Sequence, residues 1–312
     1  MQIFDAARAR GALPFEQLIP ALRAMFAGQV EVPARHVHCI ESADGEAFTS
    51  LIMPAWQPGH AYGVKIVNIA PGNGARGLPG LHASYLLHDA TTGVPVALID
   101  GNEITARRTA AASALAASYL ARQDARHLLV VGAGRVARLL PAAYLCVRSI
   151  ERVTVWARSP RAASALASEL RREGIDTQPA SDLSAAAGEA DIVSCATLAT
   201  EPIVHGRWLR EGSHLDLIGS FTPAMREADD DCFRDARLFV DTEEALAKSG
   251  ELLGPMERGV FAAGDVQGTL ALLCRGERPG RGTAAERTVF KAVGSALEDL
   301  AAAMLAVQRT IE

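Results

Sequence analysis

The stretch "LLVVGAGRVARLL", residues 128–140, decides the fold: an apolar run ends in a glycine-rich turn and opens into a helical pattern. Residues 132–137 fit the spacing G-x-G-x-x-A. In such a turn the first glycine permits a tight bend, the second lets the backbone approach a pyrophosphate, and the helix N-terminus binds the anion. The predicted dinucleotide-binding residues are Gly132, Ala133, Gly134, Arg135 and Val136. The alternative is a glycine turn that holds no ligand.

The segments around this turn favour the nucleotide site, because apolar strands and helices alternate in parallel βαβ fashion. We expect strands at 127–132, 152–157, 191–196, 214–218 and 237–241, and helices at about 135–147 and 160–173. Before them, up to about residue 113, short β-type runs lie between Pro/Gly turns, and "SYLLHD" and "PVALID" are predicted to form a hairpin. This half is typical of antiparallel or mixed sheet.

Two further helices complete the predicted α/β architecture. One is a long alanine-rich helix from about residue 105, with Thr105 as its cap, and the other is the whole tail from 282 to 312. A final helix of this length is expected to pack back on the first domain. We therefore predict a discontinuous α+β domain, 1–113 with 286–312, and a nucleotide-binding domain, 114–285.

Size and composition restrict the function. A chain of 312 residues is long enough for two domains. The formal net charge is −5 with interleaved acids and bases, so we expect small polar or anionic metabolites as ligands and no nucleic acid. The five cysteines show no CxxC pair and no metal-ligand spacing, which predicts reduced thiols in a cytoplasm and no metal. No apolar stretch approaches the ~18 residues of a membrane span.

The end of the second predicted strand lacks an expected acid. A carboxylate normally lies there and binds the ribose 2′-hydroxyl. This sequence has Ala157, followed by Arg158 and Ser159, which offer a guanidinium and a hydroxyl suited to a phosphate. We therefore favour NADP(H) as cofactor. The alternative is a surface arginine in a protein that uses NAD(H).

Three basic residues outside the nucleotide-binding domain are candidates for a second anion site: Arg35, Lys65 and Arg108. Lys65 lies in the strand-like run "GVKIVN", where alternation allows it to point inward or outward. Arg107 and Arg108 lie near the predicted helix start, where a cation opposes the helix dipole and needs another reason to be present. Taken singly, each is more often a solvated surface charge.

Several segments together identify a family resemblance. They are "VPAR", "YGVKIVNIAPGN", "DGNEITARRTAAASALAASYLAR", "VVGAGRVA", "ADIVSCAT", "LIGSFTPAMREAD", "RGERPGR" and "TVFKAVGSALEDLAAA". From about residue 30 to the C-terminus the chain resembles the ornithine cyclodeaminase/mu-crystallin family. The resemblance implies a Rossmann domain, a substrate domain made from both chain ends, and a homodimer formed through the substrate-domain sheets.

The resemblance also implies residue roles. Arg108 is similar to the arginine that grips the substrate α-carboxylate, with Arg35 beside it, and Lys65 to a lysine that polarises the imine or passes a proton. Thr109 and Val293 correspond to positions close to the cofactor. His82 falls in a pocket segment, although a histidine bonded for structural reasons explains it equally well.

One position departs from the family pattern. Cyclodeaminases of the family carry an aspartate in the loop that reads "LIGSFTPAMRE" here, and the alignment puts Phe221 at that place. Phenylalanine cannot accept a proton or hold an ammonium group, and Asp216 and Asp229 are poor substitutes by position. Ala292 also stands where many relatives have serine.

We therefore expect an NADPH-dependent reductase of cyclic ketimines, Δ1-pyrroline-2-carboxylate or Δ1-piperideine-2-carboxylate. Hydride would go to the imine carbon, Arg108 and Arg35 would hold the carboxylate, and Lys65 would assist protonation. The alternatives are ornithine cyclodeaminase, an amino-acid dehydrogenase such as alanine dehydrogenase, and a non-catalytic NADPH-binding protein like the crystallin relatives.

Overall fold

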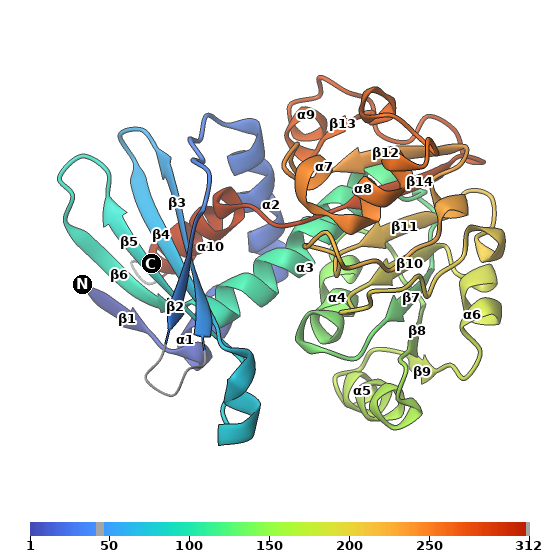
Figure 1. Ribbon diagram of the computed structural model, residues 1–312, viewed down its shortest axis with the longest axis horizontal. Coiled ribbons are helices and arrows are strands. Elements are labelled where there is room, and N and C mark those ends of the chain that lie inside the picture. The colour runs from blue at the N-terminus through green and yellow to red at the C-terminus, as the bar shows by residue number, and fades with distance from the viewer. Residues whose placement is uncertain (42–46, 310–312) are drawn as a thin grey trace. The chain divides into compact units, whose positions relative to one another are not determined.

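The computed structural model describes residues 1–41 and 47–309, which form two compact units (Figure 1). The first unit is Met1–Arg108 with Ser295–Glu312, and the second is Thr109–Gly294. Each unit has its own sheet. The first unit contains both chain ends and is bounded by Arg108 and Ser295, in place of the 113 and 286 expected from the sequence.

A six-stranded mixed sheet forms the first unit, in the order β1-β6-β5-β4-β3-β2. Its strands are β1 (Gln2–Phe4), β2 (His36–Glu41), β3 (Ala47–Gln57), β4 (Ala61–Ile69), β5 (Leu81–Asp89) and β6 (Pro95–Asp100). Strands β1 and β6 pair in parallel and the other neighbours are antiparallel, so the predicted hairpin of β5 and β6 is confirmed. The long loop between β4 and β5 contains a 3-10 turn, η1 (Pro71–Arg76).

Helices cover one face of this sheet. They include α1 (Ala6–Ala12), α2 (Phe15–Ala27) and α10 (Ala296–Gln308), and α10 contacts both α2 and strands β3, β4 and β5. The covered face is marked by one cross-strand row in which Met53, Lys65, Tyr85 and Ile99 are direct neighbours. Each of these four side chains is buried. A lysine therefore lies in a row that is otherwise apolar or aromatic.

Helix α3 (Gly101–Leu120) starts four residues before the expected point, so the prediction of Thr105 as its cap was wrong. The side chain of Asp100 accepts a hydrogen bond from the Glu103 backbone N–H at 2.8 Å, which serves the helix start. The Thr105 hydroxyl lies inside the helix and donates to the Gly101 carbonyl at 2.7 Å. Arg108 consequently lies in the second helical turn rather than the first.

The second unit is an eight-stranded parallel sheet in the order β13-β12-β14-β11-β10-β7-β8-β9. Its strands are β7 (His127–Val131), β8 (Arg152–Trp156), β9 (Thr177–Pro179), β10 (Ile192–Cys195), β11 (His214–Leu217), β12 (Ala236–Val240), β13 (Gly268–Thr269) and β14 (Arg287–Lys291). The order runs outward from β7 in both directions, which is the arrangement of a doubly wound nucleotide-binding fold.

Helices and 3-10 turns connect these strands. They are α4 (Arg135–Leu145), α5 (Pro160–Arg172), α6 (Leu183–Glu189), α7 (Ala245–Lys248), α8 (Gly250–Glu257), α9 (Leu270–Cys274), η2 (Gly206–Trp208), η3 (Asp230–Cys232) and η4 (Ala263–Asp265). The predicted strands and the two predicted helices of this region are confirmed within a few residues. Among the described residues, no helix is both long and apolar enough to cross a membrane.

The tail was predicted wrongly as one continuous helix. Residues Arg287–Lys291 form β14, which pairs in parallel with both β11 and β12 inside the second sheet. Of the tail residues that the structure describes, Ala296–Gln308 are helical, and Ser295 caps that helix by accepting from the Leu297 backbone N–H. A short strand buried between two neighbours has no polar alternation, so its pattern does not differ from that of a buried helix.

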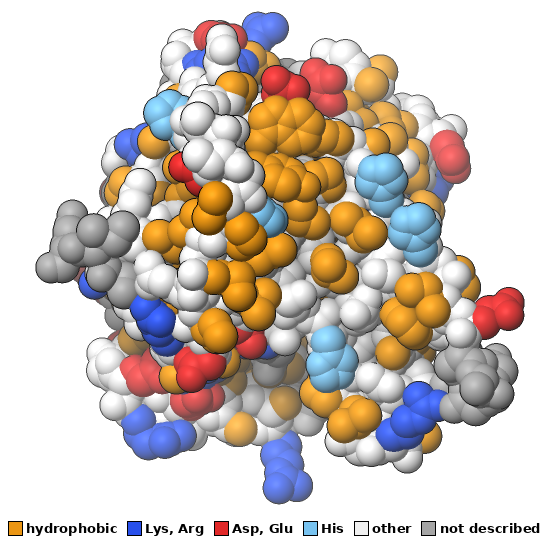
Figure 2. All heavy atoms as spheres, turned by 90° about the vertical axis from the view of Figure 1, so that its left-hand side faces the viewer, with side chains coloured by type: hydrophobic (Ala, Val, Ile, Leu, Met, Phe, Trp, Pro, Cys, Tyr) orange, Lys and Arg blue, Asp and Glu red, His pale blue; other side chains and the backbone are white. Residues whose placement is uncertain are grey.

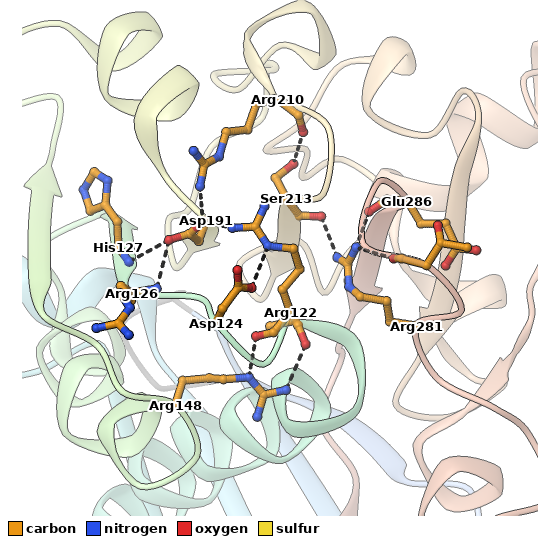
Figure 3. Close-up of polar contacts among 12 residues, drawn as sticks. Arg122, Asp124, Arg126, His127, Arg148, Asp191, Arg210, Ser213, Arg281 and Glu286 are labelled. Carbon is orange, nitrogen blue, oxygen red and sulfur yellow. Dashed lines mark hydrogen bonds and ion pairs between the residues drawn. The ribbon is translucent and has the colours of Figure 1, made fainter.

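Arginines form hydrogen bonds and ion pairs at the N-terminal ends of the strands of the second sheet (Figure 3). Asp191, just before β10, accepts hydrogen bonds from Arg122 Nη2 at 2.6 Å and from the Arg126 and His127 backbone N–H groups at 2.9 Å. Arg148 is 7% exposed and donates to backbone carbonyls of residues 117, 118, 121, 122 and 147. Arg148 thereby supplies side-chain donors to carbonyls around the C-terminal end of α3, where a helix leaves carbonyls without helical partners.

Candidate active site

The first unit holds a cluster of buried charged side chains around Lys65. Lys65 is on β4 and points to the helix-covered face, where its side chain is 2% exposed. Its Nζ lies 2.6 Å from Asp299 Oδ2 and 3.4 Å from the Thr105 hydroxyl. Of the inward and outward orientations that the sequence left open, the structure has the inward one.

Arg108 from α3 belongs to the same cluster. Its Nε lies 3.0 Å from Asp299 Oδ1, and its Nη1 lies 2.7 Å from Glu298 Oε2. Both carboxylates come from the first turn of α10 and are at most 1% exposed. Arg108 is therefore a buried cation with two carboxylate partners rather than a solvated surface charge, which supplies the reason for its presence near a helix start.

The charges of this cluster balance, and they shift one another's pKa values. Burial and, to a smaller extent, the neighbouring Arg108 lower the pKa of Lys65 to about 8, against the attraction of Asp299. Burial acts to raise the pKa of Asp299, but Lys65 and Arg108 outweigh it and hold that pKa below the usual range. At neutral pH the site thus contains an ammonium group close to its titration point. That property suits a group that passes a proton.

Tyr85 completes the surroundings of Lys65. It is the direct cross-strand neighbour of Lys65 on β5, is 1% exposed, and has no hydrogen-bond partner for its hydroxyl among the described residues. Burial raises its pKa well above the ordinary value, so the phenol stays neutral. Gly63 makes room for this ring, because a Cβ there would lie 1.9 Å from the Tyr85 oxygen.

The sequence analysis missed Glu298, Asp299 and Tyr85. A usable signal was present for the two acids, since "ALEDLAAAML" places them side by side in an otherwise apolar helix with no base nearby. Their burial depends on contacts between segments about 190 residues apart, which no local pattern contains.

Two further predicted residues, Arg35 and His82, lie beside β2 and on β5 of the first sheet. Arg35 is half-buried and directly precedes β2, whose first residue, His36, pairs with Ile52 on β3. His82 is exposed on β5 and pairs with Asn68, three residues from Lys65 on β4. Because side chains alternate along a strand, His82 points to the sheet face opposite Lys65.

The glycine-rich turn of the second unit fits a dinucleotide pyrophosphate. Gly132 has φ of +122°, and a Cβ there would lie 2.6 Å from the Ala196 carbonyl oxygen, so only glycine fits. Gly134 is the residue before α4; a Cβ there would meet nothing within 4 Å, and no side chain caps the helix. The first N–H groups of α4 thus border open space, as an anion site requires. Ala133 lies in the same turn, and Arg135 and Val136 are the first two residues of α4.

Arg158 and Ser159 follow β8 as predicted. Arg158 is exposed, and Ser159 caps α5 by accepting a hydrogen bond from the Ala162 backbone N–H at 3.3 Å. No described acidic side chain precedes them at the strand end, where Ala157 stands. The free guanidinium beside a helix N-terminus is suited to a 2′-phosphate.

Two more predicted cofactor residues, Thr109 and Val293, lie at the beginning and the end of the second unit. Thr109 is half-buried and follows Arg108 on α3. The backbone N–H of Val293 donates to Asp241 Oδ2 at 2.8 Å, and that of Gly294 donates to the same oxygen at 2.7 Å. Asp241, directly after β12, therefore fixes the loop that follows β14.

The loops after β10 and β11 are tied together by Glu227. Its carboxylate accepts from the Thr197 backbone N–H and the Gly219 backbone N–H, both at 2.7 Å. Phe221 follows in the second of these loops and is 47% exposed. The loop thus presents an aromatic ring where the resemblance placed an acid.

Neither aspartate near this loop is available in its place. Asp216 is fully buried and accepts hydrogen bonds from the hydroxyls of Ser113, Tyr144 and Ser194, while burial raises its pKa to about 6. Asp229 is bonded to the His205 ring at 2.8 Å and to the Gly206 backbone. Both carboxylates serve the packing of the second unit.

The chain belongs to the ornithine cyclodeaminase/mu-crystallin family, whose sequence profile matches residues 12–312. Delta(1)-pyrroline-2-carboxylate reductase of Paracoccus denitrificans is 46% identical over 254 residues, which are 81% of this chain and 80% of that protein. The family predicted from the sequence is therefore confirmed.

Two solved structures of related proteins are similar over nearly their whole length. One is Thermococcus litoralis Delta(1)-pyrroline-2-carboxylate reductase in complex with NADH and L-proline, with 35% identity, a TM-score of 0.92, and coverage of 100% of this chain and 98% of its own. The other is an archaeal alanine dehydrogenase dimer with bound NAD, with 27% identity, a TM-score of 0.90, and coverage of 100% and 96%. The predicted α/β fold is confirmed.

Proposed function

We propose that this protein is an NADPH-dependent reductase of cyclic ketimine carboxylates, Δ1-pyrroline-2-carboxylate or Δ1-piperideine-2-carboxylate. The observation that carries the proposal is the buried cluster in which the Lys65 ammonium and the Arg108 guanidinium share the Asp299 carboxylate. It places a proton donor beside a cation that attracts a carboxylate. The predicted activity agrees with the reductases named among the relatives.

Each residue of the cluster has a chemical task in this reaction. Lys65 donates a proton to the imine nitrogen, and Arg108, with Arg35, holds the substrate carboxylate so that the imine nitrogen stays near Lys65. The nicotinamide, bound through the glycine-rich turn, supplies the hydride for the imine carbon. Tyr85 stays neutral beside the ammonium and adds no charge to the cluster.

The other candidate functions fit these residues less well. A cyclodeaminase needs an acid where Phe221 stands, and Asp216 and Asp229 are engaged elsewhere. A protein that only stores NADPH has no need for a buried lysine whose pKa is lowered to about 8, since burying that charge costs free energy. An amino-acid dehydrogenase uses the same groups, and the substrate distinguishes it from an imine reductase.

Product analysis tests the proposal. Purified protein, NADPH and either cyclic imine are expected to yield one enantiomer of proline or pipecolate, with one NADPH consumed for each amino acid formed. If pyruvate with ammonia is converted to alanine and neither imine is reduced, the protein is an amino-acid dehydrogenase instead.

The coenzyme preference gives a specific prediction for Arg158. Arg158→Ser removes the guanidinium that would bind the 2′-phosphate, so KM for NADPH is expected to rise about 10–100-fold, the equivalent of one charged hydrogen bond. KM for NADH is expected to stay within about threefold. Arg172→Ser, at the other end of α5, removes the same charge far from the turn and serves as the control. If Arg158→Ser changed KM for NADPH and KM for NADH no more than Arg172→Ser does, Arg158 would not bind the 2′-phosphate.

We further propose that the outer face of the first sheet forms a homodimer with a second copy. The outer face carries the side chains that alternate with the Lys65 row: Ile52, Trp56, Tyr62, Val64, Ile66, Leu86, His88 and Leu98. Ile66 is 40% exposed and Leu98 is 37% exposed, and the hydrophobic side chains gather on the face shown in Figure 2. Exposed apolar side chains gathered on one face support an interface there. The related alanine dehydrogenase is described as a dimer.

Ile66→Lys tests this interface. A charge at the centre of the outer face is expected to weaken the dimer about 100-fold or more, which light scattering after size exclusion would report as a monomer. Leu145→Lys places the same charge at an exposed apolar position on α4 and is expected to leave the mass unchanged. A dimeric Ile66→Lys variant would refute the proposed interface. The cytoplasm remains the compartment that we propose, in keeping with cysteines that form no disulfide among the described residues.

A further inference from the structure

Asp299 is the group through which the two cations of the buried cluster are connected. Its Oδ1 lies 3.0 Å from Arg108 Nε and its Oδ2 lies 2.6 Å from Lys65 Nζ, so one carboxylate spans β4 and α3. The neighbouring Glu298 contacts Arg108 at 2.7 Å. Two adjacent acids on α10 therefore differ in their partners, because Asp299 contacts both cations.

We propose that Asp299 is a positioning residue of the imine reduction, which holds Lys65 as an ammonium beside Arg108 so that proton donor and carboxylate-binding group act as one unit. This inference rests on the reductase function proposed above. Asp299 itself is buried beneath Lys65 and acts through it. It is assigned no contact with substrate.

The reaction determines why the protonated form of Lys65 matters. The imine nitrogen gains the proton of the Lys65 ammonium, and the imine carbon gains hydride from NADPH, which is oxidised to NADP⁺. Lys65 is left as a neutral amine and regains a proton from water before the next turnover. An enzyme whose Lys65 is already neutral in the resting state has no proton to give.

The charged and titratable groups that face Lys65 come from three elements. They are Asp299 and Glu298 on α10, Arg108 on α3, and Tyr85 on β5. Burial and Arg108 both lower the pKa of Lys65, and Asp299 is the strongest influence that raises it. Without that carboxylate, burial and Arg108 would make Lys65 lose its proton below neutral pH.

The composition of the chain permits a direct measurement of this proton. The sequence contains only three lysines: Lys65, Lys248 and Lys291. Protein labelled with ¹³C-lysine would thus give three ε-methylene signals, and the Lys65 signal is the one missing from Lys65→Met. In the native protein its shift is expected to titrate at about pH 8. In Asp299→Asn the midpoint is expected to move down by about one pH unit or more.

The kinetic consequence has a defined sign. A proton donor must be protonated to act, so native kcat/KM for the imine is expected to fall as pH rises through about 8. In Asp299→Asn this decline is expected at lower pH, with about tenfold lower kcat/KM at neutral pH and recovery on acidification. Asp299→Glu keeps a carboxylate on a longer stem. It is expected to retain the native Lys65 midpoint, even if the shifted geometry lowers kcat.

Glu298→Gln is the matched control, since it removes the adjacent buried carboxylate that contacts Arg108. It is expected to raise KM for the imine and to leave the Lys65 midpoint within a few tenths of a pH unit, because Glu298 is the weakest of the charges acting on Lys65. A Lys65 midpoint that is unchanged in Asp299→Asn, or that moves equally in Glu298→Gln, would overturn the proposal. If Asp299→Asn does not fold, a low midpoint in Asp299→Glu overturns it instead.

The lysine titration and the pH profile of kcat/KM together separate this inference from the function on which it rests. The lysine titration needs neither cofactor nor substrate, so it reports on Asp299 even if no imine is reduced. An absent reductase activity together with a lowered Lys65 midpoint in Asp299→Asn would reject the proposed function and keep the link between Asp299 and Lys65. Reductase activity whose pH profile is the same in Asp299→Asn would reject the inference alone.

Discussion

Replacing Lys65 with methionine is expected to lower kcat/KM for the cyclic imine by about 10²–10⁴-fold, the range that general acid catalysis contributes. Methionine keeps most of the apolar stem but has no proton to donate, and β4 offers no other base at this place in the covered face. Binding of NADPH is expected to be unchanged within about twofold, because the glycine-rich turn lies in the other unit. Initial rates of NADPH oxidation and fluorescence titration with NADPH measure the two effects.

The control for this prediction is Lys248→Met. Lys248 is the partly exposed lysine at the end of α7, where it pairs with Glu244, so the same chemical change is made away from the cluster. Its kcat/KM is expected to stay within about twofold of native. A Lys65→Met enzyme that retains more than about a tenth of native kcat/KM would show that the proton comes from another group.

Replacing Arg148 with methionine is expected to lower the free energy of unfolding by roughly 4 kcal/mol, which corresponds to a melting temperature about 10 °C lower. Arg148 donates to five backbone carbonyls at 2.7–2.9 Å, and its side chain is buried against the end of α3. Methionine fills much of the space but leaves those carbonyls without their donor. Losses of this size are typical when a buried hydrogen-bond network is broken.

Arg171→Met provides the comparison for this effect. Arg171 lies at the exposed end of α5 and donates to the Ser168 hydroxyl within that helix, at 3.1 Å. Its replacement is expected to change the unfolding free energy by at most about 0.5 kcal/mol. Thermal unfolding followed by circular dichroism measures both variants. Equal melting temperatures for Arg148→Met and native protein would show that water replaces the arginine at these carbonyls.

The nucleotide-binding half was predictable because its signals are local. The turn at Gly132 needs a residue that tolerates φ of +122°, and the strands and helices after it alternate with clear periodicity. Strand β14 was missed because its signal is not local. The run "TVFK" becomes a strand only between β11 and β12, both of which lie far from it in the sequence.

The residues of the candidate site also divide into those that the sequence predicts and those that it does not. Lys65 and Arg108 stand out as cations in apolar surroundings, and the helix-dipole argument already required a reason for Arg108. Glu298 and Asp299 were missed although they stand side by side in an otherwise apolar helical run, because that run does not show which cations they meet. Their burial follows only from the packing of α10 on the sheet that holds Lys65.

The most direct test of the central claim compares two substrates at equal concentration. Purified protein is given Δ1-pyrroline-2-carboxylate with NADPH in one reaction and L-ornithine with NAD⁺ in the other, and proline and ammonia are measured in both. The account predicts rapid proline formation from the imine, and neither proline nor ammonia from ornithine. Proline with an equal amount of ammonia from ornithine, and none from the imine, would show that the protein is a cyclodeaminase that works without an acid at Phe221.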